Sequence, residues 1–309
     1  MKKCVGLLGL LMITGQLYAQ DSGYVARHIE LDSLVITASR YGFDVAGFIK
    51  RVETDTTFYK AFKNLRILAY TARNDIRILG NKDKVKASLS SVTRQQRQDG
   101  CRSMQVQQEQ TIGPFYGKDS SYNYYTAALY ASLFFTKGKV CGETNLIHQP
   151  AENGGGGGAM ERHEEQLKQL IFNPGQPIHG VPFIGGKVAI FDDKIAPMYA
   201  FSIHSAFYGQ TDCYVFTAKA LPAYKDKVVI DNLVTYFSKD NMEIVYRDYA
   251  LSYDNLFFDF DVHMQVSMTH FDHLMVPGKI EYQGNWKVPL KKREHAEFQA
   301  TFSQFSHGH

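Results

Sequence analysis

The chain contains 309 residues, of which 44% are hydrophobic, 21% charged and 13% aromatic. This is the composition of a globular protein that is large enough to bury a sizeable core. The formal net charge of +3 falls to +1 once Lys2 and Lys3 leave with an N-terminal leader, and no basic stripe follows, which excludes nucleic acid as a partner.

The first nineteen residues have the order of a secretory signal peptide. A cationic start, Met1-Lys2-Lys3, precedes a short apolar run from Val5 to Thr14, and Leu17-Tyr18-Ala19 ends in a small residue. The apolar run is too short to span a bilayer. We therefore predict a signal peptide over residues 1–19, cleavage after Ala19 and a periplasmic location.

Residues 20–40 are expected to form an extended N-terminal segment. Within it, Leu31 to Arg40 resembles the TonB-box-type segment found near the N-terminus of outer-membrane receptors. The chain that follows is too short for a receptor barrel, so the alternative is a plain extended lead-in.

Two apolar stripes with helical spacing follow. Val45, Phe48, Ile49 and Val52 form the first stripe. Phe58, Ala61, Phe62 and Leu65 form the second. This spacing predicts two short amphipathic helices or one bent helix, with Asp55 as the N-cap of the second part.

The region from Ile67 to Phe115 is typical of strands, and Asp99-Gly100 predicts a hairpin turn within it. Tyr122 to Phe135 is compatible with either a helix or a buried strand. Lys187 to Ile190 and Pro197 to Phe207 are expected to be further strands.

A glycine-rich insertion lies near residues 152–160, and a helix is expected to follow from Met160 to Phe172, ended by Asn173-Pro174-Gly175. The glycines are not a phosphate-binding loop, because Ala159 and Met160 stand where Lys and Ser or Thr are required. His163-Glu164 lacks the second histidine of a zinc protease, since residue 167 is Leu.

The clearest pattern in the chain is a strict alternation that begins at residue 258. The even positions are apolar: Phe258, Phe260, Val262, Met264, Val266 and Met268. The odd positions are polar, from Asp259 to Thr269. Period two predicts one long antiparallel strand with an apolar face inward, and we expect the six apolar residues to be the ligand-binding face if the protein binds a ligand.

The segments around this strand predict a meander of long strands over residues 212–305. Val228 to Lys239 and Met242 to Tyr253 precede it, a turn is expected at Val276-Pro277-Gly278-Lys279, and His295 to Phe305 forms the last strand. The predicted fold class is therefore α+β, with a large curved antiparallel sheet and covering helices.

Three cysteines remain after the leader: Cys101, Cys141 and Cys213. An oxidising compartment permits one disulfide and leaves one thiol, and Cys101 with Cys141 is the pairing that we favour. Their spacing does not match a zinc site.

The chain resembles the LolA/LppX-like fold of envelope lipoprotein carriers. The resemblance lies in Leu167 to Pro174 and in the segment from Val276 to Pro289, together with the order of the elements. It implies a single half-barrel domain over residues 41–309, an incomplete barrel whose concave face is covered by helices. It also implies a cavity for acyl chains, no cofactor, and lipid, acylated lipoprotein or other envelope proteins as partners.

Three alternatives stay open. The six apolar residues are also compatible with an ordinary core, because period-two apolar faces usually pack against the rest of the same domain. Asp259, Asp261 and His263 share the polar face of one strand and are candidate ligands of a metal-dependent periplasmic hydrolase, although no serine-nucleophile signature is present. The many tyrosines are also compatible with an envelope scaffold that binds another protein.

Overall fold

The computed structural model describes residues 23–143, 170–177, 186–254, 259–287 and 292–308. Its centre is one open sheet with the strand order β1-β6-β7-β8-β9-β10-β11-β12-β2-β3-β4-β5. β1 pairs with β6 in parallel, and the other pairs are antiparallel. The fold is therefore of the α+β class, as the sequence predicts, with a large open sheet and several helices.

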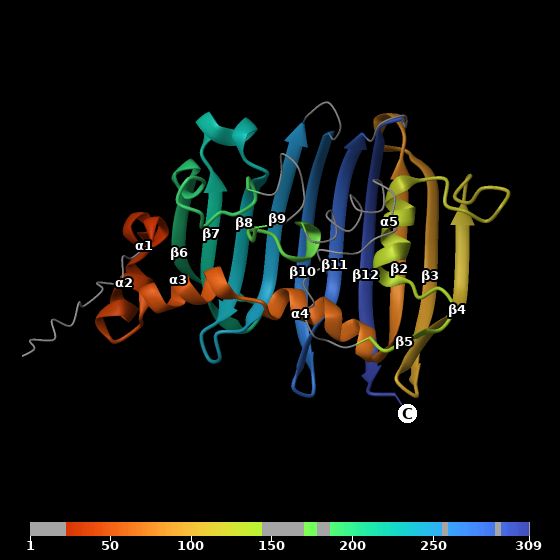
Figure 1. Ribbon diagram of the computed structural model, residues 1–309, viewed down its shortest axis with the longest axis horizontal. Coiled ribbons are helices and arrows are strands. Elements are labelled where there is room, and N and C mark those ends of the chain that lie inside the picture. The colour runs from red at the N-terminus through yellow and green to blue at the C-terminus, as the bar shows by residue number, and fades with distance from the viewer. Residues whose placement is uncertain (1–22, 144–169, 178–185, 255–258, 288–291, 309) are drawn as a thin grey trace, which may run out of the picture.

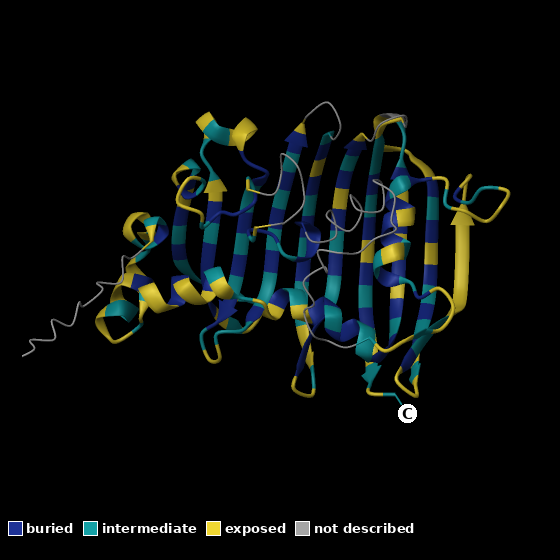
Figure 2. Ribbon diagram, viewed as in Figure 1, coloured by how far each residue is buried: buried dark blue, intermediate teal, exposed yellow. Residues whose placement is uncertain are grey.

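The sheet contains strands of very different length. These are β1 Glu30–Leu31, β2 Ala69–Leu79, β3 Val85–Gln98, β4 Cys101–Ile112, β5 Val140–Cys141, β6 Tyr199–Tyr208, β7 Thr211–Ala220, β8 Ile230–Ser238, β9 Ile244–Asp254, β10 Asp259–Phe271, β11 Leu274–Lys287 and β12 Glu294–Ser306. The two shortest strands, β1 and β5, lie at the two edges. Figure 2 shows that the long central strands alternate mainly between buried and intermediate residues, whereas β4 is exposed over most of its length.

The helices are short. They are α1 Tyr24–His28, α2 Ser33–Arg40, α3 Val45–Thr54, α4 Thr57–Asn64 and α5 Tyr125–Phe134, with 3-10 turns η1 Leu65–Ile67, η2 Asn81–Asp83, η3 Ala196–Met198 and η4 Pro222–Lys227. Residues 170–172 are also helical. In Figure 1, α3 and α4 cross the strands near one end of the sheet, and α5 lies along β12 and β2 on the same side. We call this covered side the apolar face and the opposite side the polar face.

Local sequence explains why α3 and α4 form where they do. In α3 the buried residues are Phe48, Ile49 and Val52, and in α4 they are Phe58, Ala61, Phe62 and Asn64. The side chain of Asp55 accepts a hydrogen bond of 3.3 Å from the backbone N–H of Phe58. The expected pair of amphipathic helices is confirmed. The N-cap of α4 is Thr56 and not the predicted Asp55, although Asp55, one residue earlier, is the side chain that accepts a hydrogen bond from the first turn.

The expected strands of the meander are present with small changes at their ends, but the predicted turn at Val276 to Lys279 is wrong. The chain reverses at Asp272 and His273, where Asp272 adopts a φ of +51° that Asp tolerates in tight turns. Pro277 and Gly278 lie inside β11 at a bulge. Lys279 pairs with Ser267 and Pro277 pairs with Met268, so that Gly278 is the extra residue.

Other expectations need correction in the N-terminal and middle regions. Within the segment that was expected to be extended, Tyr24–His28 and Ser33–Arg40 are helical. Lys187 to Ile190 form turns and not a strand. Tyr125–Phe134, which the sequence left open, is the helix α5. The glycine-rich insertion, the first part of the expected helix from Met160, and His163-Glu164 lie outside the described residues.

A disulfide joins Cys101 in β4 to Cys141 in β5, which is the pairing that the sequence favoured. Cys213 is a buried free thiol in β7. Within the described part of the chain, no helix combines the length and the apolar character that crossing a membrane requires.

Candidate functional site

The predicted apolar residues of β10 lie on the covered side of the sheet. Phe260, Val262, Met264 and Val266 have exposed fractions of 2% or less, whereas Met268 is half-buried. Phe258 lies outside the described residues. The alternation therefore assigns the two faces of the strand as expected, while ligand binding by these residues stays a prediction.

Two short pieces of chain, α4 and residues 170–172, pack against each other on the apolar face. The Phe62 ring of α4 lies 4.4 Å from that of Phe172, and the Phe58 ring lies 6.4 Å from that of Tyr249 in β9. The hydroxyl of Tyr249 donates a hydrogen bond of 2.5 Å to the carbonyl oxygen of Ile171. Residues 170–172 are thus attached to the sheet beside α4.

A second group of rings lies where α5 meets β11 and β12. Tyr130 packs edge-on against Phe298 at 4.8 Å, and Phe298 stacks on Tyr282 at 4.3 Å. The indole N–H of Trp286 donates a hydrogen bond to the Tyr282 hydroxyl, and its ring lies 4.9 Å from Phe260. Burial raises the pKa of Tyr130 and of Tyr282, which keeps both phenols neutral.

One charged side chain lies within this apolar layer. Arg247 in β9 has an exposed fraction of 5%, and its Nε atom donates a hydrogen bond of 3.0 Å to Oγ1 of Thr235. Its Cζ atom lies 4.3 Å from the centre of the Phe58 ring. Burial lowers the pKa of Arg247, an effect that the carboxylate of Asp55 opposes. Among the described residues, no carboxylate forms an ion pair with Arg247.

Sequence reasoning missed Arg247, although a signal was present. It stands in phase with the inward residues Tyr249, Leu251 and Tyr253 of the same strand. A charged residue in an otherwise apolar inward set is unusual.

A further buried polar group lies at the end of α4. Asn64 has an exposed fraction of 3%, and its Nδ2 atom donates a hydrogen bond of 2.7 Å to the carbonyl oxygen of Met275. Its Oδ1 atom is buried without a hydrogen-bond partner. The contact between α4 and the sheet thus contains incompletely paired polar groups at two separate places.

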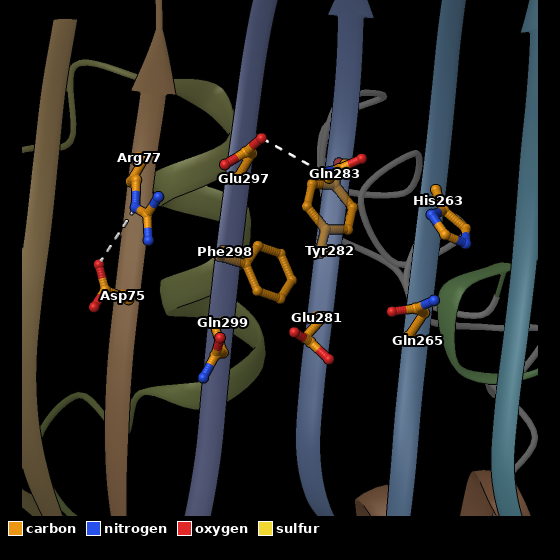
Figure 3. Close-up of a pocket in the computed structure, with 10 residues that line it drawn as sticks. All are labelled: Asp75, Arg77, His263, Gln265, Glu281, Tyr282, Gln283, Glu297, Phe298 and Gln299. Carbon is orange, nitrogen blue, oxygen red and sulfur yellow. Dashed lines mark hydrogen bonds and ion pairs between the residues drawn. The ribbon is translucent and has the colours of Figure 1, made fainter. Parts of the chain in front are cut away.

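The polar face carries a shallow pocket of about 290 Å³ across β2, β12, β11 and β10 (Figure 3). It is lined by Asp75, Arg77, His263, Gln265, Glu281, Tyr282, Gln283, Glu297, Phe298 and Gln299. Beside it, Oδ1 of Asp248 lies 3.0 Å from Nε2 of His263, and Oδ2 of Asp248 accepts a hydrogen bond of 2.7 Å from Nε2 of Gln265. This surface is rich in carboxylates and amides, in contrast to the apolar layer on the other side.

The three candidate metal ligands of β10 have separate environments. Asp259 forms an ion pair with Arg293, Asp261 is exposed, and His263 contacts Asp248. Across the described residues, no group of three or more His, Cys, Asp or Glu side chains is arranged to hold a metal ion. The structure therefore does not bring together the ligand set that a hydrolase of this kind requires.

Tyrosines gather at one place on the polar face. Tyr208 stacks on Tyr246 at 4.8 Å, Tyr236 lies 5.5 Å from Tyr246, and the Tyr208 hydroxyl is 2.7 Å from Oγ of Ser267. All three rings are half-buried. The expected tyrosine-rich surface is thus a local cluster, and its binding of a protein stays a prediction.

No known protein family and no curated protein matches the chain. The solved structures that are similar to it include the following two. A "putative outer membrane lipoprotein-sorting protein domain" from Vibrio parahaemolyticus is 9% identical, with a TM-score of 0.26, over 77% of this chain and 84% of that chain. A DUF1329 family protein from Desulfovibrio piger is 10% identical, with a TM-score of 0.24, over 81% of this chain and 93% of that chain. TM-scores this low carry no argument about function.

Proposed function

We propose that this protein is an exported, non-enzymatic carrier that binds a lipid or the acyl chain of a lipoprotein between the apolar face and its covering helices. The ligand lies along β10, against Phe260, Val262, Met264 and Val266. Envelope lipids or acylated lipoproteins are the partners that supply and receive it. This is also the function that the sequence resemblance to LolA/LppX-like carriers implies.

The observation that carries the proposal is the way in which α4 covers β9 and β11. α4 has eight residues. The ring of Phe58 contacts Tyr249, and the ring of Phe62 contacts Phe172. A helix of this length is marginal on its own, so its stability comes from packing. An apolar ligand that takes the place of α4 on the sheet restores the contacts that the sheet loses.

Incomplete pairing of the buried polar groups lowers the free-energy cost of lifting α4. A buried polar atom without a partner destabilises the closed state by roughly 1–3 kcal/mol, and Oδ1 of Asn64 is such an atom. The guanidinium of Arg247 has one neutral partner and lies under Phe58. Both groups gain partners, from water or ligand, when α4 moves away.

Two observations support a periplasmic location. The leader over residues 1–19 has the order of a secretory signal. The disulfide between Cys101 and Cys141 is of the kind that persists in oxidising compartments.

The test is a binding experiment with a neutral apolar probe. Protein purified from its own envelope is analysed by native mass spectrometry and organic extraction, and the delipidated protein is titrated with the fluorophore N-phenylnaphthylamine. We expect a co-purifying lipid or acylated peptide and saturable binding of one probe per chain. A protein that is lipid-free as isolated and gives no saturable fluorescence contradicts the proposal.

Hydrogen exchange locates the bound probe. We expect the amides of α4 to exchange faster in the complex, because the ligand takes the place of α4 on the sheet. The amides of α5 serve as the internal control. That helix is attached to the sheet by the hydrogen bonds of Thr126 with Glu294 and of Tyr130 with Asn74. Equal exchange of α4 with and without probe places the ligand elsewhere.

A further inference from the structure

Arg247 is a buried cation that uses one N–H group, at Nε, in a hydrogen bond to another described residue. A guanidinium has more N–H donors than any other side chain, and charged residues are almost never buried unless they are paired. Here the Nε atom bonds to the hydroxyl of Thr235, directly opposite in the sheet register. A neutral hydroxyl cannot compensate for the loss of hydration of a full charge.

The carboxylate whose charge acts on Arg247 belongs to the covering layer. Asp55 lies between α3 and α4, and it uses its two oxygens to accept hydrogen bonds from Thr57 Oγ1 at 2.6 Å and from the Phe58 N–H at 3.3 Å. Asp55 is therefore tied to the first turn of α4. When α4 leaves the sheet, Asp55 and the Phe58 ring leave with it, and no carboxylate of the described residues forms an ion pair with Arg247.

The position of Arg247 relative to the predicted ligand-binding face defines the shape of the site. Arg247 faces Val266 in register, and the inward residues that follow on β9 face the remaining apolar residues of β10. The facing pairs are Tyr249 with Met264, Leu251 with Val262 and Tyr253 with Phe260. From Arg247 to Tyr253 the strand covers about 20 Å. One leaflet of membrane hydrocarbon is about 15 Å thick, so that this distance suits a long acyl chain.

We propose that the guanidinium of Arg247 binds the anionic head group, a carboxylate or a phosphate, of a single-chain lipid whose acyl chain lies along β9 and β10 toward Tyr253 and Phe260. This inference rests on the proposed carrier function and adds the chemical class of the ligand. Arginine suits this role because its fork of N–H groups matches both head groups in a bidentate arrangement. The head group thus replaces the charge of Asp55, and the chain replaces the rings of α4.

The experiment compares three ligands with one chain length: hexadecanoate, hexadecyl phosphate and hexadecanol. Each ligand is titrated into delipidated protein that holds N-phenylnaphthylamine, and the displacement of the probe gives the affinity of the ligand. The ligand concentrations stay below those at which the ligand itself aggregates. We expect at least one of the two anions to bind about tenfold or more tightly than hexadecanol, which is the factor that a charge-assisted hydrogen bond supplies. Preference for hexadecanoate alone assigns a carboxylate, and preference for hexadecyl phosphate alone assigns a phosphate.

The variant Arg247→Met removes the charge and keeps an apolar side chain of similar length. We expect this variant to bind the probe. We also expect the three ligands to bind it with the same affinity as one another. Arg77→Met, on the polar face, is the matched control and retains the preference of the parent protein. The comparison of ligands in the parent protein tests the inference even where Arg247→Met does not fold.

The outcomes separate the inference from the function on which it rests. Probe binding with equal affinity for the three ligands in the parent protein overturns the anionic head group and leaves the carrier function standing. A preference for anions that survives in folded Arg247→Met overturns the role of this arginine. The absence of probe binding in the parent protein overturns both.

Discussion

The Oε1 atom of Glu294 accepts a hydrogen bond of 2.7 Å from the backbone N–H of Thr126. Its Oε2 atom accepts one of 2.9 Å from the N–H of Tyr125. The carboxylate at the start of β12 therefore caps α5, because the N-cap residue Tyr124 does not cap the helix with its own side chain. A negative charge at this end of a helix also interacts favourably with the helix dipole. In this respect α5 is anchored to the sheet more firmly than α4.

Loss of this cap destabilises the protein. We expect Glu294→Ala to lower the free energy of unfolding by about 1–2 kcal/mol, because two N–H groups lose their acceptor. Urea unfolding measures the change. Glu297→Ala, on the polar face of the same strand, is the control with an expected change within about 0.5 kcal/mol. Equal effects of the two substitutions show that the cap is energetically unimportant.

The assignment of the two faces of β10 is tested by a buried charge. Met264→Asp places a carboxylate at a fully buried position and is expected to unfold the protein or to lower its unfolding free energy by more than about 4 kcal/mol. Thr269→Asp adds the same group at an exposed position of the same strand and is expected to cost about 1 kcal/mol or less. Thermal unfolding followed by circular dichroism distinguishes the two variants, and a stable Met264→Asp means that the faces are inverted.

His263 separates the carrier from the hydrolase. We expect His263→Ala to change the unfolding free energy by about 1 kcal/mol or less, because its contact with Asp248 is partly exposed and such pairs contribute little. Probe binding is expected to remain unchanged. The metal content of both proteins is measured by elemental mass spectrometry. A stoichiometric metal that disappears in the variant supports the hydrolase in place of the carrier.

Asp55 is expected to compete with an anionic ligand for Arg247. In Asp55→Asn the negative charge is absent, while the amide oxygen still caps α4. We expect severalfold tighter binding of hexadecanoate and little change for hexadecanol, measured by probe displacement. Asp44→Asn, which affects the N-cap of α3 in the same way, is the matched control. Tighter binding of both ligands in Asp55→Asn indicates a looser α4 and not a change of charge.

The disulfide between Cys101 and Cys141 closes a loop with a sequence separation of 40 residues. Loop-closure entropy for this length gives a stabilisation of about 4 kcal/mol as an upper value. We expect the double variant Cys101→Ser and Cys141→Ser to lose about 2–4 kcal/mol in urea unfolding. The parent protein in reductant is expected to behave like the double variant, whereas reductant leaves the double variant unchanged. If reductant does not change the unfolding free energy of the parent protein, the stabilising role of the disulfide is contradicted.

Much of the architecture could be read from local patterns. The alternation from Phe260 to Val266 predicted which side of β10 is buried, because the strand period is set by backbone geometry alone. The spacing of Phe58, Ala61 and Phe62 predicted α4 for the same kind of reason. The prediction of a turn at Pro277 was wrong, because the position of a turn depends on which residues pair across the hairpin. Pro277 and Gly278 lie within the strand at a bulge.

The sequence by itself determined the class of the fold, the inward residues of its long strands and the helical periods of α3 and α4, since each depends on neighbours within a few residues. Only the tertiary structure decided that Arg247 is buried, because its cover is the Phe58 ring, which comes from a helix far away in the chain. It likewise decided that Asp259, Asp261 and His263 have separate environments, since their partners lie on other segments. The burial and pairing of a charge are properties of the surroundings in space, and the sequence around a residue does not contain them.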